Sequence, residues 1–328
     1  MSADALAAVL IEAFSNGPFG GNGAAVVALD APMPDDWMQG VAASLRQSET
    51  AFLLLCERGW MLRWFTPACE VPLCGHATLA ALLALAHWGK LQTGERTWLH
   101  SRSGPLEVAL PEGRSGWGAI VLPSAELRSE VAPTGLTELL RDRLGCGLEG
   151  CWSSELGYWV VLLPREAPLA SMDGLAAALE GPLRQGLVLM QSLDATESGP
   201  RIGPEPADYQ LRFFAPGLGI PEDPVTGSAH ALVAPWWQKR LGRRLVRGWQ
   251  CSDRPGGMVC EAVSSAMIRL TGSGHLLWDG TLRTACEGWA PSAEPGADRN
   301  LDPWSALWDA WRTATRLPCS TASGAIPS

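Results

Sequence analysis

LRWFTP, at residues 62–67, returns as LRFFAP at residues 211–216. In both copies a further proline follows five residues after the first. After a three-residue insertion in the second copy, CGHA at residues 74–77 lies opposite TGSA at residues 226–229, and an apolar run follows each tetrad. A repeat of this kind indicates that the chain consists of two copies of one structural unit.

Each copy contains a predicted strand and a predicted helix. The strand ends at the proline of its Phe-x-Pro motif, because proline cannot donate a ladder hydrogen bond, and the helix begins at the glycine tetrad. The first helix is expected over about residues 77–88 and carries almost no charge, which is typical of a buried helix. The second is expected over about residues 229–241, where Pro235 kinks it or delays its start. Buried helices of this kind require a sheet wrapped around them.

The remaining apolar segments are predicted strands, at residues 9–14, 24–29, 51–55, 106–110, 159–163 and 186–191. A doubly wound parallel sheet would need helices in regular alternation with these strands, and that alternation is missing. The class is therefore α+β, with two pseudo-repeated domains, each a mostly antiparallel sheet around a central helix. We expect the first half at residues 1–125, completed by a returning strand near 268–284, and the second half at residues 126–267.

Residues 285–328 form an extension outside the repeat. Trp304, Trp308 and Trp311 follow Asp302-Pro303 at helical spacing, which predicts a short capped helix. We expect this tryptophan stripe to pack on its own protein, and docking on a partner is the alternative.

Charge and composition favour a small-molecule ligand. The net charge of −9 includes neither an acidic block nor a basic patch, which argues against a nucleic acid or an anionic membrane as partner. The start of the chain has no basic segment, its apolar run is broken at Glu12, and no stretch is long enough to span a bilayer. Nine cysteines without a C-x-x-C pair indicate reduced thiols and a cytoplasmic protein.

The two glycine tetrads predict an anion site. A helix N-terminus offers unpaired backbone N–H groups and a partial positive charge, and glycine lets a ligand approach that backbone closely. We therefore expect Gly75, Thr226 and Gly227 to bind a substrate carboxylate, or the negative charge that develops when a carbon acid loses a proton. The alternative is that both glycines only permit close helix packing.

Four polar residues are the catalytic candidates. Glu49 lies at the start of an apolar segment, where a carboxylate is costly unless it is paired or protonated, and a general acid/base must both accept and return a proton. Asp223, in a rigid acidic loop, could join Ser228 and His76 in a cluster that orients the substrate and relays protons. The alternatives are a Glu49 that faces water and an Asp223 that only caps a turn. His230, further into an apolar helix, is less suited.

Two further patterns do not indicate a cofactor or a metal. GCGLEG at residues 145–150 has the glycine spacing of a dinucleotide-binding loop, but it follows a predicted helix at residues 136–144 and precedes a strand, the reverse of the required order. Cys69, Cys74 and His76 lack zinc spacing. The sequence therefore predicts neither a cofactor nor a metal.

Five blocks of the chain resemble the PhzF-like family of phenazine biosynthesis, in order and in spacing. They are AF at 13–14 with PFGGN at 18–22, SETAF at 48–52, FTP at 65–67, CGHATLA at 74–80, and GIPEDPVTGSAH at 219–230. The resemblance covers about residues 9 to 284. It implies the diaminopimelate-epimerase fold, in which two similar halves each wrap a sheet around a helix and the site lies in the cleft between them.

The resemblance also implies residue roles. The catalytic glutamate of the family maps onto Glu49, its site histidine onto His76, and its aspartate and serine onto Asp223 and Ser228, and Asn22 of the first block is an expected substrate contact. Phenazine-pathway members shift a proton on a dihydro-hydroxyanthranilate without a metal or an organic cofactor. A homodimer is implied as well.

Relatives with the same fold suggest alternatives. Diaminopimelate epimerase and proline racemase use two cysteines as opposed acid and base, but here only Cys74 matches, and the second block reads Thr226 where a thiol is needed. The sequence also departs from the family at Gly23, where proline is frequent. We expect a cofactor-independent isomerase that moves a proton on a small carboxylate. The alternatives are an epimerase or lyase on an amino or hydroxy acid, and a non-catalytic binding protein.

Overall fold

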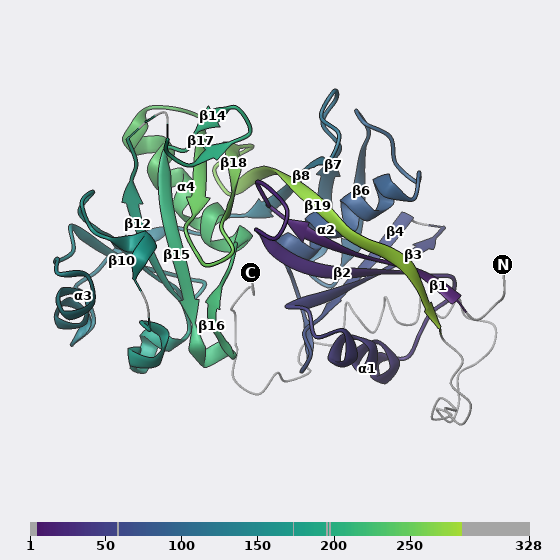
Figure 1. The fold of residues 1–328 in the computed structure, drawn as a ribbon, viewed down its shortest axis with the longest axis horizontal. Helices are drawn as coiled ribbons and strands as arrows, with labels where there is room; N and C mark the ends of the chain where they lie inside the picture. Colours follow the sequence, from purple (N-terminus) through teal and green to yellow (C-terminus); the bar gives the residue numbers. More distant parts are fainter. Residues whose placement is uncertain (1–4, 58, 173, 195, 197, 284–328) are drawn as a thin grey trace.

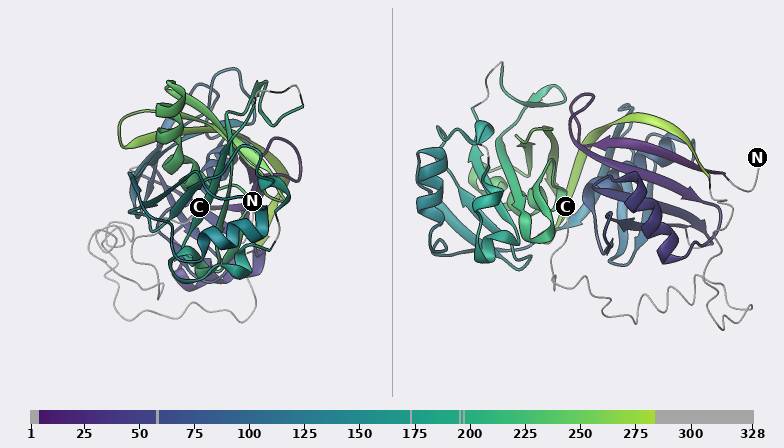
Figure 2. Two further views of the ribbon diagram at one scale, coloured as in Figure 1. Left: turned by 90° about the vertical axis from the view of Figure 1, so that its left-hand side faces the viewer. Right: turned by 60° about the horizontal axis from the view of Figure 1, so that its bottom comes forward.

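The computed structural model describes residues 5–57, 59–172, 174–194, 196 and 198–283. The predicted extension at residues 285–328, with its tryptophan stripe, lies outside these residues. Figure 1 shows two halves side by side, a purple and blue first half and a teal and green second half, and one long strand that runs between them. The turned views in Figure 2 show the same division.

The first half wraps strands around a helix that the sequence predicts to be buried. Every residue from Gly75 to Leu85 of the central helix is buried, and β1, β2, β3 and β8 contact it. The elements are β1 (Ala5–Ala13), β2 (Asn22–Leu29), α1 (Asp35–Leu45), β3 (Glu49–Cys56), β4 (Gly59–Phe65), β5 (Glu70–Val71), α2 (Gly75–His87), β6 (Arg96–Ser101), β7 (Gly104–Ala109) and β8 (Trp117–Pro123).

The second half repeats this plan around α4 (Gly227–Leu241). Its strands are β9 (Leu127–Ser129), β10 (Gly150–Ser154), β11 (Trp159–Leu162), β12 (Leu187–Ser192), β13 (Arg201–Ile202), β14 (Glu205–Pro206), β15 (Tyr209–Ala215), β16 (Ile220–Asp223), β17 (Leu245–Gln250) and β18 (Gly256–Ala262). A further helix, α3 (Leu136–Leu144), lies at the outer end of this half in Figure 1.

Both central helices begin within their tetrads, as predicted, but at the glycine, two residues before the expected starts at residues 77 and 229. Pro235 does not delay α4, which starts at Gly227 and continues through the proline. Proline lacks an N–H group, so the carbonyl of Ala231 loses its helical partner. The hydroxyl of Ser124 donates to that carbonyl at 2.8 Å and replaces the missing hydrogen bond.

One strand, β19 (Met267–Arg283), belongs to both halves. Its first part pairs with β18 and with β8, and its second part pairs with β1, all antiparallel. In Figure 1 it runs from the green half across the purple half. The last described strand therefore completes the sheet around the first helix.

The α+β class and the mostly antiparallel sheet are confirmed, and the predicted strands overlap β1, β2, β3, β7, β11 and β12. Four strand pairs run parallel, and they are related by the repeat: β2 with β3 and β11 with β12, then β4 with β6 and β15 with β17. The helix α1 was not predicted. The predicted loop does lie between α3 and β10, at residues 145–149, and Gly150 begins the strand.

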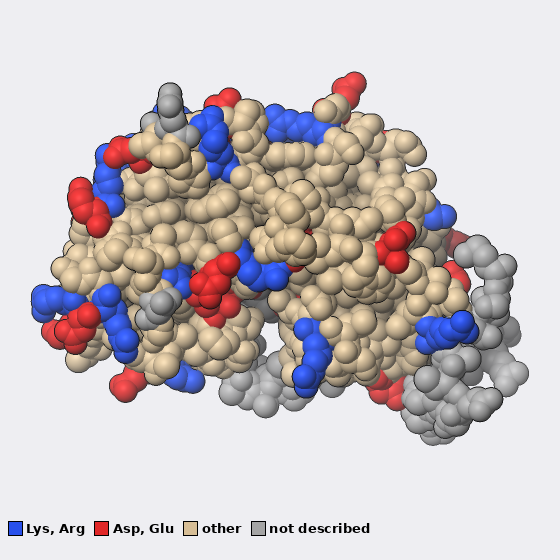
Figure 3. Space-filling model, viewed as in Figure 1, with Lys and Arg blue, Asp and Glu red and all other residues tan. Residues whose placement is uncertain are grey.

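The surface agrees with the absence of charge blocks in the sequence. On the face in Figure 3, basic and acidic side chains are scattered over both halves, and neither sign gathers into a large patch. Among the described residues, no helix is long and apolar enough to cross a membrane.

Candidate active site

The two helix N-termini meet where the halves join. A Cβ placed on Gly75 would lie 3.4 Å from the Cα of Gly227, and one placed on Gly227 would lie 3.5 Å from the Cα of Gly75. Within the described residues, neither helix start has a side-chain cap. Two positive helix ends with uncapped N–H groups are thus brought together, which is an arrangement that favours an anion.

Glu49 and His76 form a buried pair at this junction. Glu49 is the first residue of β3 and His76 is the second residue of α2, and their exposures are 1% and 0%. The Glu49 Oε2 atom lies 3.0 Å from His76 Nε2. Strand β3 continues from Glu49 as an apolar run, which is why its first residue is drawn into the core. The alternative of a water-facing Glu49 is therefore wrong.

Cys74 completes a compact group with this pair. Its Sγ atom lies 3.5 Å from His76 Nδ1 and 4.0 Å from Nε2. Burial, reinforced by the negative charge of Glu49, raises the pKa of the Cys74 thiol well above its usual range, so the thiol is protonated at neutral pH.

The same three side chains have the spacing of a metal site. One ligand atom each from Glu49, Cys74 and His76 lies within 4.8 Å of the others. Thiolate, imidazole and carboxylate are all zinc ligands. The linear spacing of the sequence did not indicate this group, because Glu49 reaches it from a strand far from the C-G-H motif.

The second half supplies a hydrogen-bonded loop around Asp223. Asp223 is 1% exposed, and its Oδ1 accepts a hydrogen bond of 2.7 Å from the Asn22 amide. Its Oδ2 accepts one from the Thr226 hydroxyl. Thr226 occupies the cap position of α4 but turns its hydroxyl to Asp223, which leaves the first N–H groups of the helix to a ligand.

Gln250 holds this loop rigid and was not anticipated from the sequence. Its Oε1 accepts from the Thr226 N–H at 2.8 Å, and its Nε2 donates to the carbonyl of Asp223 at 2.6 Å. The sequence alone does not reveal the role of such a glutamine, because that role depends on which loop the side chain contacts in the folded protein. Asn22, an expected substrate contact, also donates to the carbonyl of Val225 and so joins the two halves.

Ser228 lies one residue after Gly227, buried at the start of α4. The hydroxyl of Tyr158, which no motif in the sequence indicated, is 3.5 Å from the Oγ atom of Ser228. His230 points elsewhere, because its Nδ1 is hydrogen-bonded to the Tyr209 hydroxyl at 2.9 Å in the core. The structure thus brings Glu49, His76, Asp223 and Ser228 to the joined helix ends and leaves His230 out.

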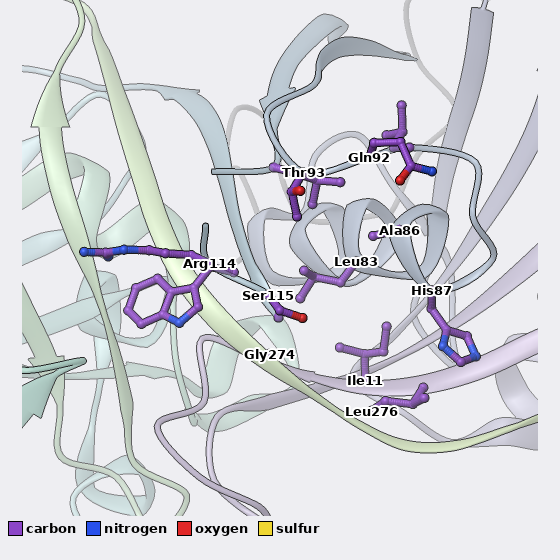
Figure 4. A pocket seen from close by; sticks show the side chains of 14 residues that line it. Ile11, Leu83, Ala86, His87, Gln92, Thr93, Arg114, Ser115, Gly274 and Leu276 are labelled. Atoms are coloured by element: carbon purple, nitrogen blue, oxygen red, sulfur yellow. The ribbon is translucent and has the colours of Figure 1, made fainter. Parts of the chain in front are cut away.

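A separate cavity of about 390 Å³ lies at the other end of α2. Leu83 and His87 of the last helical turns line it together with Ile11, Arg114 and Leu276, as Figure 4 shows. None of the predicted site residues lines this cavity. The predicted catalytic residues lie instead at the helix starts.

Comparisons with known proteins agree with this geometry. The family model described as phenazine biosynthesis-like protein matches residues 11–125 and 169–280. An uncharacterised isomerase of Pseudomonas aeruginosa is 37% identical over 274 residues, which cover 83% of this chain and 97% of that protein. A PhzF-family crystal structure from Enterococcus faecalis superposes with a TM-score of 0.73 at 29% identity, covering 85% of this chain and 99% of that one.

A hydroxyproline epimerase from Agrobacterium vitis shares the fold at 12% identity, with a TM-score of 0.52 over 86% of this chain and 93% of that one. The predicted epimerase-like fold is therefore confirmed. The chain belongs to the phenazine biosynthesis-like PhzF family of isomerases and epimerases.

Proposed function

We propose that this protein is an isomerase that moves a proton on a small carboxylate substrate, with Glu49 as general acid/base and without a metal or an organic cofactor. The observation that carries the proposal is the buried contact of Glu49 with His76 beside two uncapped helix N-termini. Membership of an isomerase family supports the reaction class. The homodimer and the cytoplasmic location stay predictions.

The groups have complementary tasks in this proposal. The helix starts at Gly75 and Gly227 bind the substrate carboxylate and favour the negative charge that forms when a C–H bond is broken. Glu49 takes the proton and returns it to another carbon of the same substrate. His76 keeps the side-chain carboxylate of Glu49 oriented through the 3.0 Å contact between the two residues. Asp223, held by Asn22, and Ser228 position the rest of the substrate.

The metal-free part of the proposal rests on the resemblance to the phenazine-pathway enzymes. Glu49, Cys74 and His76 have the spacing of a metal site, and a zinc ion bound there would hold Cys74 as the thiolate and release its proton. Such an ion would occupy Glu49 and His76, the groups that handle the proton, and would therefore inhibit the proposed reaction.

Two-thiol epimerisation is disfavoured by the second half. The residue opposite Cys74 in the repeat is Thr226, whose hydroxyl donates to Asp223. An epimerase or lyase that uses Glu49 would share the same deprotonated intermediate, and its product would identify it. A binding protein without catalysis would have no physical need for a buried carboxylate beside a buried imidazole, because each is costly to desolvate.

The test is deuterium incorporation from D₂O into a panel of small cyclic and amino-acid carboxylates, followed by NMR. Glu49→Gln is expected to lower exchange by about 10²- to 10⁴-fold. Glu57→Gln, an exposed glutamate just beyond the far end of β3, is the matched control and keeps the wild-type rate. Wild-type exchange by Glu49→Gln would remove Glu49 as the base and make Cys74 the next candidate.

A further inference from the structure

The second half carries no side chain at the position that corresponds to Glu49. The repeat aligns Phe65 with Phe214. Thr50 pairs with Phe65 across β3 and β4, and Leu187 pairs with Phe214 across β12 and β15. Thr50 therefore corresponds to Leu187. One residue earlier, Glu49 corresponds to Gly186.

On the neighbouring strand the difference in side-chain size is reversed: the first half has the small residue and the second half has the large one. Ala25 pairs in parallel with Thr50, and Trp159 pairs in parallel with Leu187, so the preceding residues Ala24 and Tyr158 correspond. The first half has a small residue on β2 beside a large one on β3. The second half has Tyr158 just before β11 beside a glycine just before β12.

Gly186 makes room for the tyrosine ring. A Cβ on Gly186 would lie 2.3 Å from Cδ1 of Tyr158, a separation that real atoms do not show, so the ring fills the space that a side chain there would take. The ring also packs on Phe213, with centroids 4.8 Å apart, and Tyr158 is 1% exposed. Its hydroxyl is thereby directed to Ser228 at the start of α4, at 3.5 Å.

The hydroxyl is a hydrogen-bond donor in this setting. Burial raises the pKa of Tyr158 to about 12, and the negative charge of Asp223 acts in the same direction. The phenol therefore keeps its proton throughout the physiological range. A protonated hydroxyl beside a helix N-terminus stabilises negative charge on an oxygen without transferring a proton.

We propose that Tyr158 is a substrate-contacting residue that donates a hydrogen bond to the oxygen on which negative charge develops when Glu49 removes the proton. The inference rests on the proposed function. When Glu49 takes the proton, the electron pair of the C–H bond moves into the adjacent carbonyl or carboxylate, and the O–H bond of Tyr158 stays intact. When Glu49 returns the proton to another carbon, the charge leaves that oxygen. The first half then supplies the base and the second half supplies the electrophilic contact.

The chain contains only two tyrosines, which makes a direct observation possible. Both are buried, and Tyr209 hydrogen-bonds His230 in the core, so it is a matched control. Protein labelled with 3-fluorotyrosine gives two fluorine resonances, assigned with Tyr158→Phe and Tyr209→Phe. Oxalate, a planar dianion that resembles a carboxylate-derived enolate, is the probe. Saturating oxalate is expected to move the Tyr158 resonance and to leave the Tyr209 resonance in place.

A Tyr158 resonance that does not move with oxalate, or equal movement of both resonances, would overturn the proposal.

The kinetic counterpart uses a carboxylate that the wild type exchanges in D₂O. Tyr158→Phe is expected to slow exchange by about 10²- to 10³-fold with an unchanged pH profile, as for loss of one oxyanion donor, and Tyr209→Phe by less than about threefold. A wild-type rate for Tyr158→Phe would refute Tyr158 alone. Full activity of Glu49→Gln would instead refute the proposed base and leave the fluorine result standing.

Discussion

The two halves of the molecule share their framework residues but not their reactive ones. Arg63 and Arg212 occupy the same repeat position, both are buried, and each binds a glutamate through two nitrogens, Glu70 in the first half and Glu222 in the second. At the helix starts, however, Cys74 and His76 correspond to Thr226 and Ser228. Both halves of the duplicated fold therefore keep the buried arginine–glutamate pair that links neighbouring strands. The proposed base Glu49 and its partner His76 lie in the first half, and Asp223 and the hydroxyl groups of Thr226 and Ser228 lie in the second.

The largest expected effect tests whether the two framework arginines are equivalent. Loss of Arg63 leaves Glu70 paired with Arg102 at 2.7 Å. Loss of Arg212 removes the donor for the carbonyls of Leu169 and Met172 as well as the partner of Glu222. We expect Arg212→Met to lower the free energy of unfolding by about 3 to 5 kcal/mol and Arg63→Met by at least about 1 kcal/mol less. Urea unfolding measures both, and equal losses would contradict the distinction.

The next effect tests whether position 186 is a glycine in order to accommodate the large ring of Tyr158. Gly186→Ala forces a Cβ against the Tyr158 ring and is expected to destabilise by about 1 to 3 kcal/mol through overpacking. In a Tyr158→Leu background the same substitution should cost much less, since the ring is gone. A double-mutant cycle by urea unfolding measures the coupling. Additive effects would show that Gly186 is not there to accommodate Tyr158.

A smaller effect concerns His230, which lies in α4 but outside the candidate site. Burial lowers the pKa of His230 to about 3, so the folded protein holds it neutral while the unfolded chain takes up a proton below pH 6.5. The free energy of unfolding therefore falls by about 1.4 kcal/mol per pH unit between pH 6.5 and pH 3. From pH 7 to pH 5, wild type should lose about 2 kcal/mol more than His230→Gln. Parallel pH profiles in urea unfolding would be the contrary result.

The smallest expected effect concerns the proline in α4, which has no counterpart in α2. Ser124→Ala leaves the buried carbonyl of Ala231 without its donor and should cost about 1 kcal/mol. Restoring the helical N–H group with Pro235→Leu should make Ser124→Ala nearly neutral. Thermal unfolding of the two single variants and the double variant is the measurement. An equal cost of Ser124→Ala in both backgrounds would mean that Ser124 acts through another contact.

The repeat made the framework predictable from sequence. The Phe-x-Pro strand ends and the two glycine tetrads carry local signals, and both helices begin where those signals lie. Helix α1 was missed although Trp37, Met38 and Ala42 lie at helical spacing on one buried face; Gly40 in its middle lowers the helix propensity of the segment.

The candidate site was predicted less completely, because it depends on strand register. Glu49 and His76 belong to recognisable motifs. Tyr158 and Gln250 do not, and they reach the site through the pairing of β11 with β12 and of β17 with β18. Cys74 lies two residues before His76 in the sequence, but its approach to Glu49 depends on where β3 lies beside α2.

The position of β19 has a consequence for how the protein is made. Ribosomes deliver the first half well before residues 267–283, yet β1 and β8 pair with that strand. Until β19 has emerged from the ribosome, the edges of β1 and β8 stay unpaired beside α2, a helix that is apolar on all sides. The first half cannot complete its sheet during synthesis of its own residues, and unpaired strand edges of this kind are prone to aggregate. Folding of the nascent chain is thereby postponed until nearly all of the described residues have been translated.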